Sequence, residues 1–393
     1  MPNSAPKLQL DLEDLTLYEG ATVLLRRTLA QLCTGETFEV RGDSPQLAEQ
    51  LATWCRKEGH HCKPTQGVSG RYSIESGGVT QSVVTSRVEI SDTADPTWGL
   101  APRGARIESG GPEFGFTLRR KRDVWARELS TIYAQAAANQ WSVSRDIPWS
   151  ELPQLSPEVE GAVAQIMTFL TENEFAALYV PARFIPRIHP HYREVVEVLA
   201  MQVVDEARHA EAFTRRAEAG GARLGTTAIS GQLSLKTLLE EPDFTTATFL
   251  LCVMGEGTFL TLLKFLGEHA PDPVTASLAR LAHRDEARHV AFGTEHMRYV
   301  FEREPEKRLS LVAAVERRSQ MLASISGLSP YVHDALVIYA AGGVSTAQIR
   351  SGALHVANLQ RDMDRSRRER LQALGFEPAV ASEMSAYHTK NFM

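Results

Sequence analysis

The feature that most constrains this chain is the pentapeptide DEARH, which begins at position 205 and again at position 285. Each copy places a Glu and a His three residues apart, as Glu206 with His209 and Glu286 with His289. Residues three apart share one face of an α-helix, so each pair can direct a carboxylate oxygen and an imidazole nitrogen at one point. A single Glu-x-x-His pair is a common surface contact, whereas two identical copies in long amphipathic segments predict a shared metal site.

Each DEARH segment is preceded by a helical stretch that offers another carboxylate, as a site for two metal ions requires. In FLTENEFAALYVPARF, apolar residues in steps of four pass through Glu174 but not through Glu172. In FLLCVMGEGTFLTLLKFL, the single acidic residue is Glu256, which would be costly to bury unpaired. The predicted ligands are therefore Glu174, Glu206, His209, Glu256, Glu286 and His289.

This donor set narrows the choice of metal. Four carboxylates and two imidazoles favour two divalent iron or manganese ions with positions left open for oxygen. A structural zinc site would use fewer carboxylates in a closed tetrahedron. The alternative is a pair of Glu–His contacts in an ordinary polar network, and it leaves Glu256 unexplained.

Residues 119 to about 302 resemble the ferritin-like di-iron carboxylate oxygenases and oxidases. EFAALYVPARF followed by DEARH is similar to the first half-site of bacterial multicomponent monooxygenase hydroxylases. The resemblance implies two Fe ions, or an Fe/Mn pair, with O₂ as co-substrate and the four glutamates as catalytic ligands. It also implies that Asp205 and Asp285 support the ligand histidines, assisted by Arg208 and Arg288. The alternative for both arginines is a surface ion pair.

Three positions depart from the patterns of these relatives. Phe213 stands where the ribonucleotide reductase small subunit carries its radical Tyr, and Phe cannot hold that radical. Leu260 stands where the multicomponent monooxygenases carry a Thr. His283 lies three residues before Glu286, close to the additional ligand His of the arylamine N-oxygenases. His283 is therefore an additional candidate ligand, with a supporting role or a surface position as alternatives.

The N-terminal part has a different character, because strand and helix signals alternate from residue 8 to about 92. LQLDLED, GETFEVRGD and RYSIE predict strands, and SPQLAEQLATWCRKEG predicts a helix. This pattern resembles the TusA-like (SirA-like) sulfur carriers. Tyr18 occupies the position of their sulfur-carrying Cys, so the resemblance implies a module without persulfide chemistry.

These patterns predict an α+β multidomain chain. A small TusA-like α/β sandwich is expected over residues 1–92, a Gly/Pro-rich linker over 93–118, and an all-α ferritin-like bundle with the two metals over 119–393.

Composition and charge limit the expected partners and location. With 42 basic and 48 acidic residues the formal net charge is −6, so no nucleic-acid partner is expected. No uninterrupted run of 18 apolar residues occurs, so no membrane association is expected. Four scattered cysteines and the lack of a signal-like N-terminus favour the cytoplasm. The expected partner is a small-molecule substrate, and a redox partner and homodimerisation are left open.

The function expected from the sequence is an O₂-dependent di-iron oxidoreductase, such as a monooxygenase, that acts on a small organic substrate. The alternatives are an N-oxygenase-like enzyme with His283 as a ligand, an Fe/Mn oxidase, and, in another class, a non-catalytic metal-binding or interaction protein. Phe213, Cys252 and Phe259 are candidate pocket residues, with ordinary core packing as the alternative.

Overall fold

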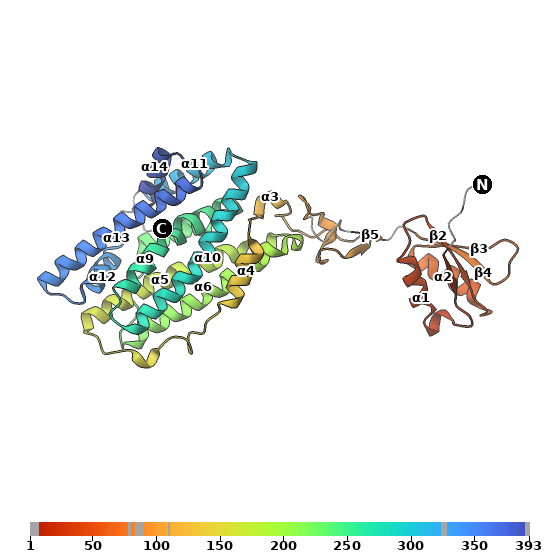
Figure 1. The fold of residues 1–393 in the computed structure, drawn as a ribbon, viewed down its shortest axis with the longest axis horizontal. Helices are drawn as coiled ribbons and strands as arrows, with labels where there is room; N and C mark the ends of the chain where they lie inside the picture. Colours follow the sequence, from red (N-terminus) through yellow and green to blue (C-terminus); the bar gives the residue numbers. More distant parts are fainter. Residues whose placement is uncertain (1–7, 78–79, 83–89, 109–110, 324–327, 390–393) are drawn as a thin grey trace. The chain divides into compact units, whose positions relative to one another are not determined.

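The structure, a computed structural model, describes residues 8–77, 80–82, 90–108, 111–323 and 328–389 (Figure 1). The chain forms two compact units. The first comprises Met1–Glu89 with Asp95–Phe114, and the second comprises Ile90–Ala94 with Gly115–Met393. The linker expected over 93–118 is thus divided between the two units.

The first unit is built on a four-stranded sheet with the order β1-β2-β4-β3. β1 runs parallel to β2, and the other neighbours are antiparallel. The expected strands and the second helix are present. The elements are β1 (Gln9–Asp11), η1 (Leu17–Glu19), α1 (Ala21–Leu29), β2 (Thr37–Arg41), α2 (Leu47–Glu58), β3 (His61–Pro64) and β4 (Arg71–Glu75), followed by β5 (Thr80–Ser82), η2 (Pro96–Trp98) and β6 (Arg106–Glu108).

One apolar core holds the sheet and its two helices together. Phe38 on β2 pairs with Ile74 on β4, and both side chains are fully buried with Leu25 of α1 and Leu51 of α2. Alternation along β2 directs Phe38 and Val40 to this core, as the sequence pattern requires. Tyr18 lies in η1 with 91% of its surface exposed, and the TusA-like resemblance stays a prediction.

The second unit is helical. Its long helices α5, α6, α9 and α10 run side by side, with α13 against α9 (Figure 1). In chain order the elements are α3 (Lys121–Val124), α4 (Leu129–Ala138), η3 (Trp149–Glu151), α5 (Pro157–Phe184), η4 (Ile185–Arg187), η5 (Pro190–Tyr192), α6 (Arg193–Ala219), α7 (Ile229–Leu239), α8 (Phe244–Thr248), the π-helix η6 (Phe249–Glu256), α9 (Gly257–Glu268), α10 (Pro273–Arg303), α11 (Lys307–Met321), α12 (Pro330–Ala341), α13 (Thr346–Ala373) and α14 (Pro378–Thr389).

The two longest helices of the site begin with strong local signals. Ser156 caps α5 by accepting a hydrogen bond from the Val159 amide, and Asp272 caps α10 by accepting from the Thr275 amide. A Pro follows each cap at the first helical position, where its missing amide hydrogen costs nothing. These caps fix where each helix starts and therefore which face carries its glutamate.

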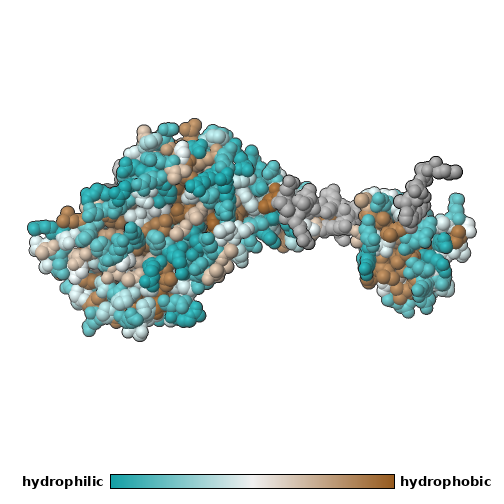
Figure 2. Space-filling view, viewed as in Figure 1, coloured by the Kyte–Doolittle hydropathy of each residue, from teal (hydrophilic) through white to brown (hydrophobic). Residues whose placement is uncertain are grey.

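The segment Phe244–Glu268 is long and apolar enough, by length and composition alone, to cross a membrane. Its most apolar window has a mean hydropathy of 1.7, and 83% of that window is buried inside the protein. Polar residues interrupt the segment, which is why a search for uninterrupted apolar runs passes over it. Burial in the bundle accounts for its composition, while the visible face of the bundle is largely hydrophilic (Figure 2).

Close approach of α10 to η6 depends on a glycine. A Cβ on Gly293 would lie 2.4 Å from the Cβ of Cys252, a separation that real side chains do not tolerate. Gly293 lies one turn after His289, so this contact brings the second DEARH helix against the segment that ends at Glu256.

Candidate metal centre

The structure brings all six predicted donor residues together in the core of the helical unit. Each of these residues is at most 4% exposed. The donors come from four helical segments: Glu174 from α5, Glu206 and His209 from α6, Glu256 from the end of η6, and Glu286 and His289 from α10.

A first group of donors surrounds His209. Its Nδ1 lies 3.5 Å from Glu174 Oε2, 3.3 Å from Glu206 Oε2 and 3.3 Å from Glu286 Oε1. One ligand atom from each of these four residues can be chosen so that all lie within 4.8 Å of one another. Two ligand atoms that bind one ion at right angles, each at about 2.1 Å, are about 3 Å apart. The spacing therefore suits a single divalent ion.

A second group surrounds His289 in the same way. Its Nδ1 lies 3.1 Å from Glu206 Oε1, 3.4 Å from Glu286 Oε2 and 3.9 Å from Glu256 Oε1. Glu206 and Glu286 thus place one oxygen in each group, whereas Glu174 and Glu256 each belong to one group only. Glu206 and Glu286 would thus serve both groups if each group held a cation.

Many of the buried side-chain atoms of these six residues lack hydrogen-bond partners. Seven such atoms occur in these six residues: Glu174 Oε1, Glu206 Oε1 and Oε2, His209 Nδ1, Glu256 Oε2, Glu286 Oε2 and His289 Nδ1. Buried polar atoms are almost always paired, because an unpaired one loses its hydration without compensation. Their convergence from four helical segments fits a pair of divalent cations.

The pKa shifts of the donor residues also fit a site for divalent cations. Burial raises the pKa of Glu174 well above its ordinary value, and Glu206 raises it further. Burial also raises the pKa of Glu256, with Glu286 adding to the effect. Burial alone would lower the pKa of His209 and His289, but the surrounding carboxylates raise both well above the ordinary range. The cluster therefore retains protons that a cation would displace.

The two aspartates of the DEARH motifs support the histidines in a crossed manner. His209 Nε2 lies 3.2 Å from Asp285 Oδ2, and His289 Nε2 lies 3.4 Å from Asp205 Oδ2. Each motif thus holds the histidine of the other motif. Because Nε2 faces an aspartate, Nδ1 of each ring is the nitrogen left to face the cluster.

Arg208 and Arg288 join the two aspartates into one network. Arg208 donates to Asp285 Oδ2 at 2.9 Å and also contacts Asp205. Arg288 donates to Asp285 Oδ1 at 2.7 Å and to Asp205 Oδ2 at 3.1 Å. Both arginine side chains are only 9% exposed, so the alternative of surface ion pairs is wrong. Burial would raise the pKa of Asp285, but His209, the hydrogen bond from Trp141 and the charge of Arg288 hold it well below its ordinary value.

Three residues of this surrounding layer carry no sequence signal that singles them out. Trp141 donates from Nε1 to Asp285 Oδ2 at 2.6 Å, and its ring stacks on His209. Gln140 donates to Asp205 Oδ1 at 3.1 Å. Gln202 donates to Glu256 Oε1 at 2.8 Å, and it lies on the same face of α6 as Glu206. That helical spacing is the only signal that could have identified one of them.

A small pocket opens directly on the donor cluster, with about 10 Å³ of free space, room for about one water molecule. Besides Glu174, Glu256 and Glu286 it is lined by Asn173, Ala177, Leu251 and Phe259. Of the two alternatives for Phe259, pocket lining and core packing, the structure therefore shows pocket lining. Phe213 instead packs beside the His209 ring, with centroids 6.2 Å apart, and Cys252 lies in the core 3.9 Å from Gln202 Nε2.

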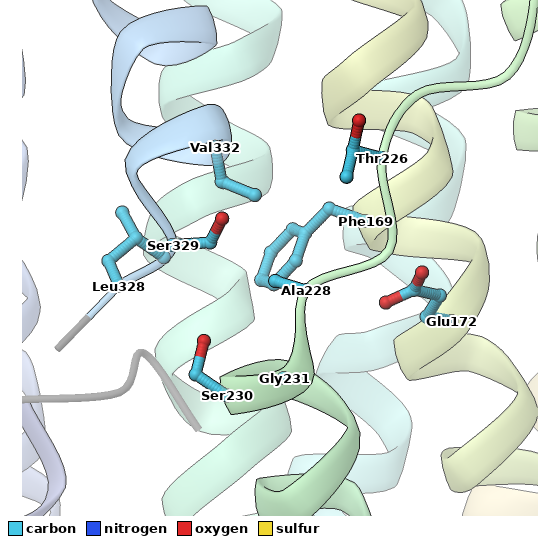
Figure 3. Close-up of a pocket in the computed structure, with 9 residues that line it drawn as sticks. All are labelled: Phe169, Glu172, Thr226, Ala228, Ser230, Gly231, Leu328, Ser329 and Val332. Carbon is cyan, nitrogen blue, oxygen red and sulfur yellow. The ribbon is translucent and has the colours of Figure 1, made fainter. Parts of the chain in front are cut away.

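A second pocket is linked to the first through the stacked rings of Phe169 and Phe259. Phe169 stacks on Phe259 with ring centroids 6.1 Å apart, and Phe169 also lines the pocket shown in Figure 3. The half-buried side chain of Glu172 on α5 and the hydroxyl of Ser230 contribute polar groups to the lining of this second pocket (Figure 3). Glu172 therefore points away from the donor cluster, as the steps of four predicted.

His283 is not brought into either donor group. It lies with Leu260, Thr261 and Lys264 in the lining of a separate surface pocket between α9, α10 and α13. Three residues on a helix correspond to about −60°, so from Glu286 the position of His283 turns away from the side that His289 occupies. The interpretation of His283 as an additional ligand is thus corrected.

No protein-family model and no curated protein matches this chain. Among solved structures, an R2-like ligand-binding oxidase from Sulfolobus acidocaldarius is 16% identical, covers 64% of this chain and 92% of its own, and gives a TM-score of 0.42. An R2-like ligand-binding oxidase with an aerobically reconstituted Mn/Fe cofactor is 16% identical over 67% of this chain and 91% of its own, with a TM-score of 0.37. A Synechococcus protein with aldehyde deformylating oxidase activity is 15% identical over 59% and 98%, with a TM-score of 0.44. These scores are low, and the functional conclusion rests on the chain's own residues.

Proposed function

We propose that the helical unit is an O₂-dependent oxidoreductase that holds two metal ions, Fe/Fe or Mn/Fe, and oxidises a small organic substrate. The observation that carries this proposal is that six buried residues place ligand atoms around two adjacent points, while seven of their side-chain atoms have no hydrogen-bond partner. Four carboxylates and two divalent ions balance in charge, which removes the cost of burying the glutamates alone.

The donor types favour iron and manganese. Carboxylate oxygens predominate, two imidazoles complete the set, and neither donor group contains a thiolate. Each ion would have four protein ligands, three carboxylate oxygens and one imidazole nitrogen, which leaves coordination positions open. When bound, such ions activate O₂ for the oxidation of an organic substrate.

The residues around the cluster then have separate tasks. Glu206 and Glu286 hold the two ions next to each other, and Asp205 and Asp285 fix the ring orientation of the histidines. Leu251 and Phe259 give the small adjoining pocket an apolar wall next to the donor cluster, and a substrate would reach the cluster along this wall by displacing these side chains.

The residue at position 213 favours direct oxidation of the substrate over storage of a radical. Phe213 packs beside His209 and has no phenolic hydroxyl that could be oxidised. For a hydroxylation, R–H, O₂, two electrons and two protons give R–OH and water. The two electrons require a reductant, and we propose a separate redox partner protein as their source.

The first experiment is metal reconstitution. Metal-free protein is loaded with Fe(II) or Mn(II) without oxygen, and metals per chain are counted at several pH values. We expect close to two metals per chain. We also expect tighter binding as pH rises, because Glu174, Glu256, His209 and His289 must lose protons whose pKa values are raised. Fewer than one Fe(II) or Mn(II) per chain would contradict the proposal.

A matched pair of variants on α5 tests the assignment. Glu174→Gln should lower the metal count, whereas Glu172→Gln on the same helix should leave it at two, because Glu172 faces the second pocket. Exposure of the reduced, iron-loaded protein to O₂ should then consume O₂ and give a transient visible absorption. Two bound metals without any O₂ consumption would favour the alternative of a non-catalytic metal-binding protein.

A further inference from the structure

The π-helix that ends at Glu256 leaves one backbone carbonyl without its usual donor. The Gly257 amide donates to the carbonyl of Cys252, five residues earlier, and not to that of Val253, four residues earlier. Val253 is fully buried, so water cannot supply the missing donor. Arg370 of α13 supplies it instead, since its Nε donates to the Val253 carbonyl oxygen at 2.9 Å.

Glycine at position 257, the first residue of α9, allows Arg370 to approach the backbone of η6 closely. A Cβ on Gly257 would lie 2.4 Å from Arg370 Nε and 2.5 Å from its Cζ, so only glycine admits the guanidinium here. In the described part of the chain Arg370 makes no ion pair, and its other hydrogen bond goes to the Ser366 hydroxyl at 3.3 Å. A largely buried cation without a carboxylate is costly, and here it faces the backbone of the π-helix.

The next carbonyl of η6, that of Met254, is also linked to α13 by hydrogen bonds. Thr258 donates to the Met254 carbonyl oxygen at 2.7 Å, and Arg367, one turn before Arg370 on α13, donates from Nε to the Thr258 hydroxyl at 3.2 Å. Two consecutive carbonyls just before Glu256 are thus tied, directly or through Thr258, to arginines of α13. Gln202 holds the carboxylate of Glu256 from the opposite helix, α6.

We propose that Arg370 is a positioning residue for Glu256: it stabilises the π-helical turn that directs this carboxylate into the second donor group. The inference rests on the proposed function, because it gives Glu256 the role of a metal ligand. A π-turn inserts one extra residue into the helix, and one residue corresponds to a rotation of about 100°. If the turn reverted to α-helical bonding, Glu256 would rotate out of its group, whereas Glu174 on α5 would stay in place.

The test uses Mn(II) alone as the probe, added to the full-length chain. The wild-type protein should bind two Mn(II), whose electron paramagnetic resonance spectrum is that of a spin-coupled pair. The Arg370→Gln variant should bind the Mn(II) of the second donor group roughly tenfold or more weakly, which is the usual effect of losing a residue that supports a metal ligand. Its spectrum should then be the six-line spectrum of an isolated Mn(II) ion. Arg368→Gln is the matched control, because Arg368 is partly exposed and pairs with Asp364 on the same helix.

Gly257→Ala tests the same contact without removing a charge, and it keeps the test decisive if Arg370→Gln does not fold. It should displace the guanidinium and weaken the second Mn(II) selectively. Two tightly bound, spin-coupled Mn(II) ions in both variants would overturn the role of Arg370 and leave the proposed function intact. Equal weakening of both ions would also overturn it, since that is the effect of general destabilisation. A wild-type protein that binds no Mn(II) would overturn the proposed function and this inference together.

Discussion

Two of the charged clusters buried in the described part of the helical unit differ in how their polar atoms are paired. In one, the fully buried Arg216 of α6 donates from Nη1 to Glu160 Oε1 at 2.6 Å and from Nη2 to Asp272 Oδ2 at 2.8 Å. Its Nε donates to the Thr275 hydroxyl at 2.7 Å, so each nitrogen has a partner. In the other, the donor cluster, seven atoms of six residues have none.

This difference separates a structural ion pair from a binding site. Burial alone does not distinguish them, because both clusters lie in the core and both combine residues from α5, α6 and α10. The Arg216 cluster brings its own cation and fixes the start of α10, where Asp272 is the capping residue. The donor cluster has carboxylates and imidazoles converging on two points, and it needs cations from solution.

The largest expected effect is on stabilisation by metal. Glu286 has one oxygen in each donor group, so Glu286→Gln should weaken both sites at once. At a metal concentration about a thousandfold above the dissociation constant, each site adds about 4 kcal/mol to the free energy of unfolding. Urea unfolding with and without Mn(II) measures this gain, and the variant should lose most of it.

The metal-free form of the same variant provides the internal control. Gln has the shape of Glu without its charge, so the metal-free variant should be at least as stable as the metal-free wild-type protein. A metal-free variant that is several kcal/mol less stable would mean that Glu286 is held by protein contacts, as Glu160 is, and would remove the distinction between the clusters.

The next effect concerns the paired cluster. Arg216→Met leaves Glu160 and Asp272 buried without their cation, and removal of one partner from a buried pair costs about 3–5 kcal/mol. The loss should be the same with and without Mn(II), because this cluster shares no residue with the donor groups. Urea unfolding of the variant measures it.

Arg215→Met is the control for the Arg216 prediction. Arg215 is the exposed neighbour on α6 whose guanidinium lies over the Trp149 ring. Its loss should cost much less than the loss of Arg216. Equal losses for the two variants would contradict the structural role of the buried pair.

The identity of the six donor residues could be expected from the sequence, because it depends on spacing within single helices. The i, i+3 pairs and the steps of four around Glu174 fix which side chains share a face. The α/β character of the N-terminal unit could be predicted for a similar reason, since alternation places Phe38 and Val40 on one side of a strand.

The remaining features depend on how separate segments meet, which no local pattern records. The crossed pairing of Asp205 with His289, and of Asp285 with His209, depends on the register between α6 and α10. The π-helix depends on a donor from α13, more than 100 residues later in the chain. His283 lies three residues before Glu286 and His289 three residues after it, so the two histidines are about 120° apart around α10, and His289 is the one that joins a donor group.

The smallest expected effect concerns Trp141, which lies just after α4 and carries no motif. Its indole donates to Asp285 Oδ2, and Asp285 in turn holds His209. Trp141→Phe should weaken the metal of the His209 group about tenfold, which is about 1.4 kcal/mol, by loosening this support. Trp149→Phe is the matched control, because that indole donates at the same 2.6 Å to a backbone carbonyl, that of Val143. A loss of metal affinity in both variants would assign the effect to packing; a loss only in Trp141→Phe would extend the metal centre to a residue outside the four donor segments.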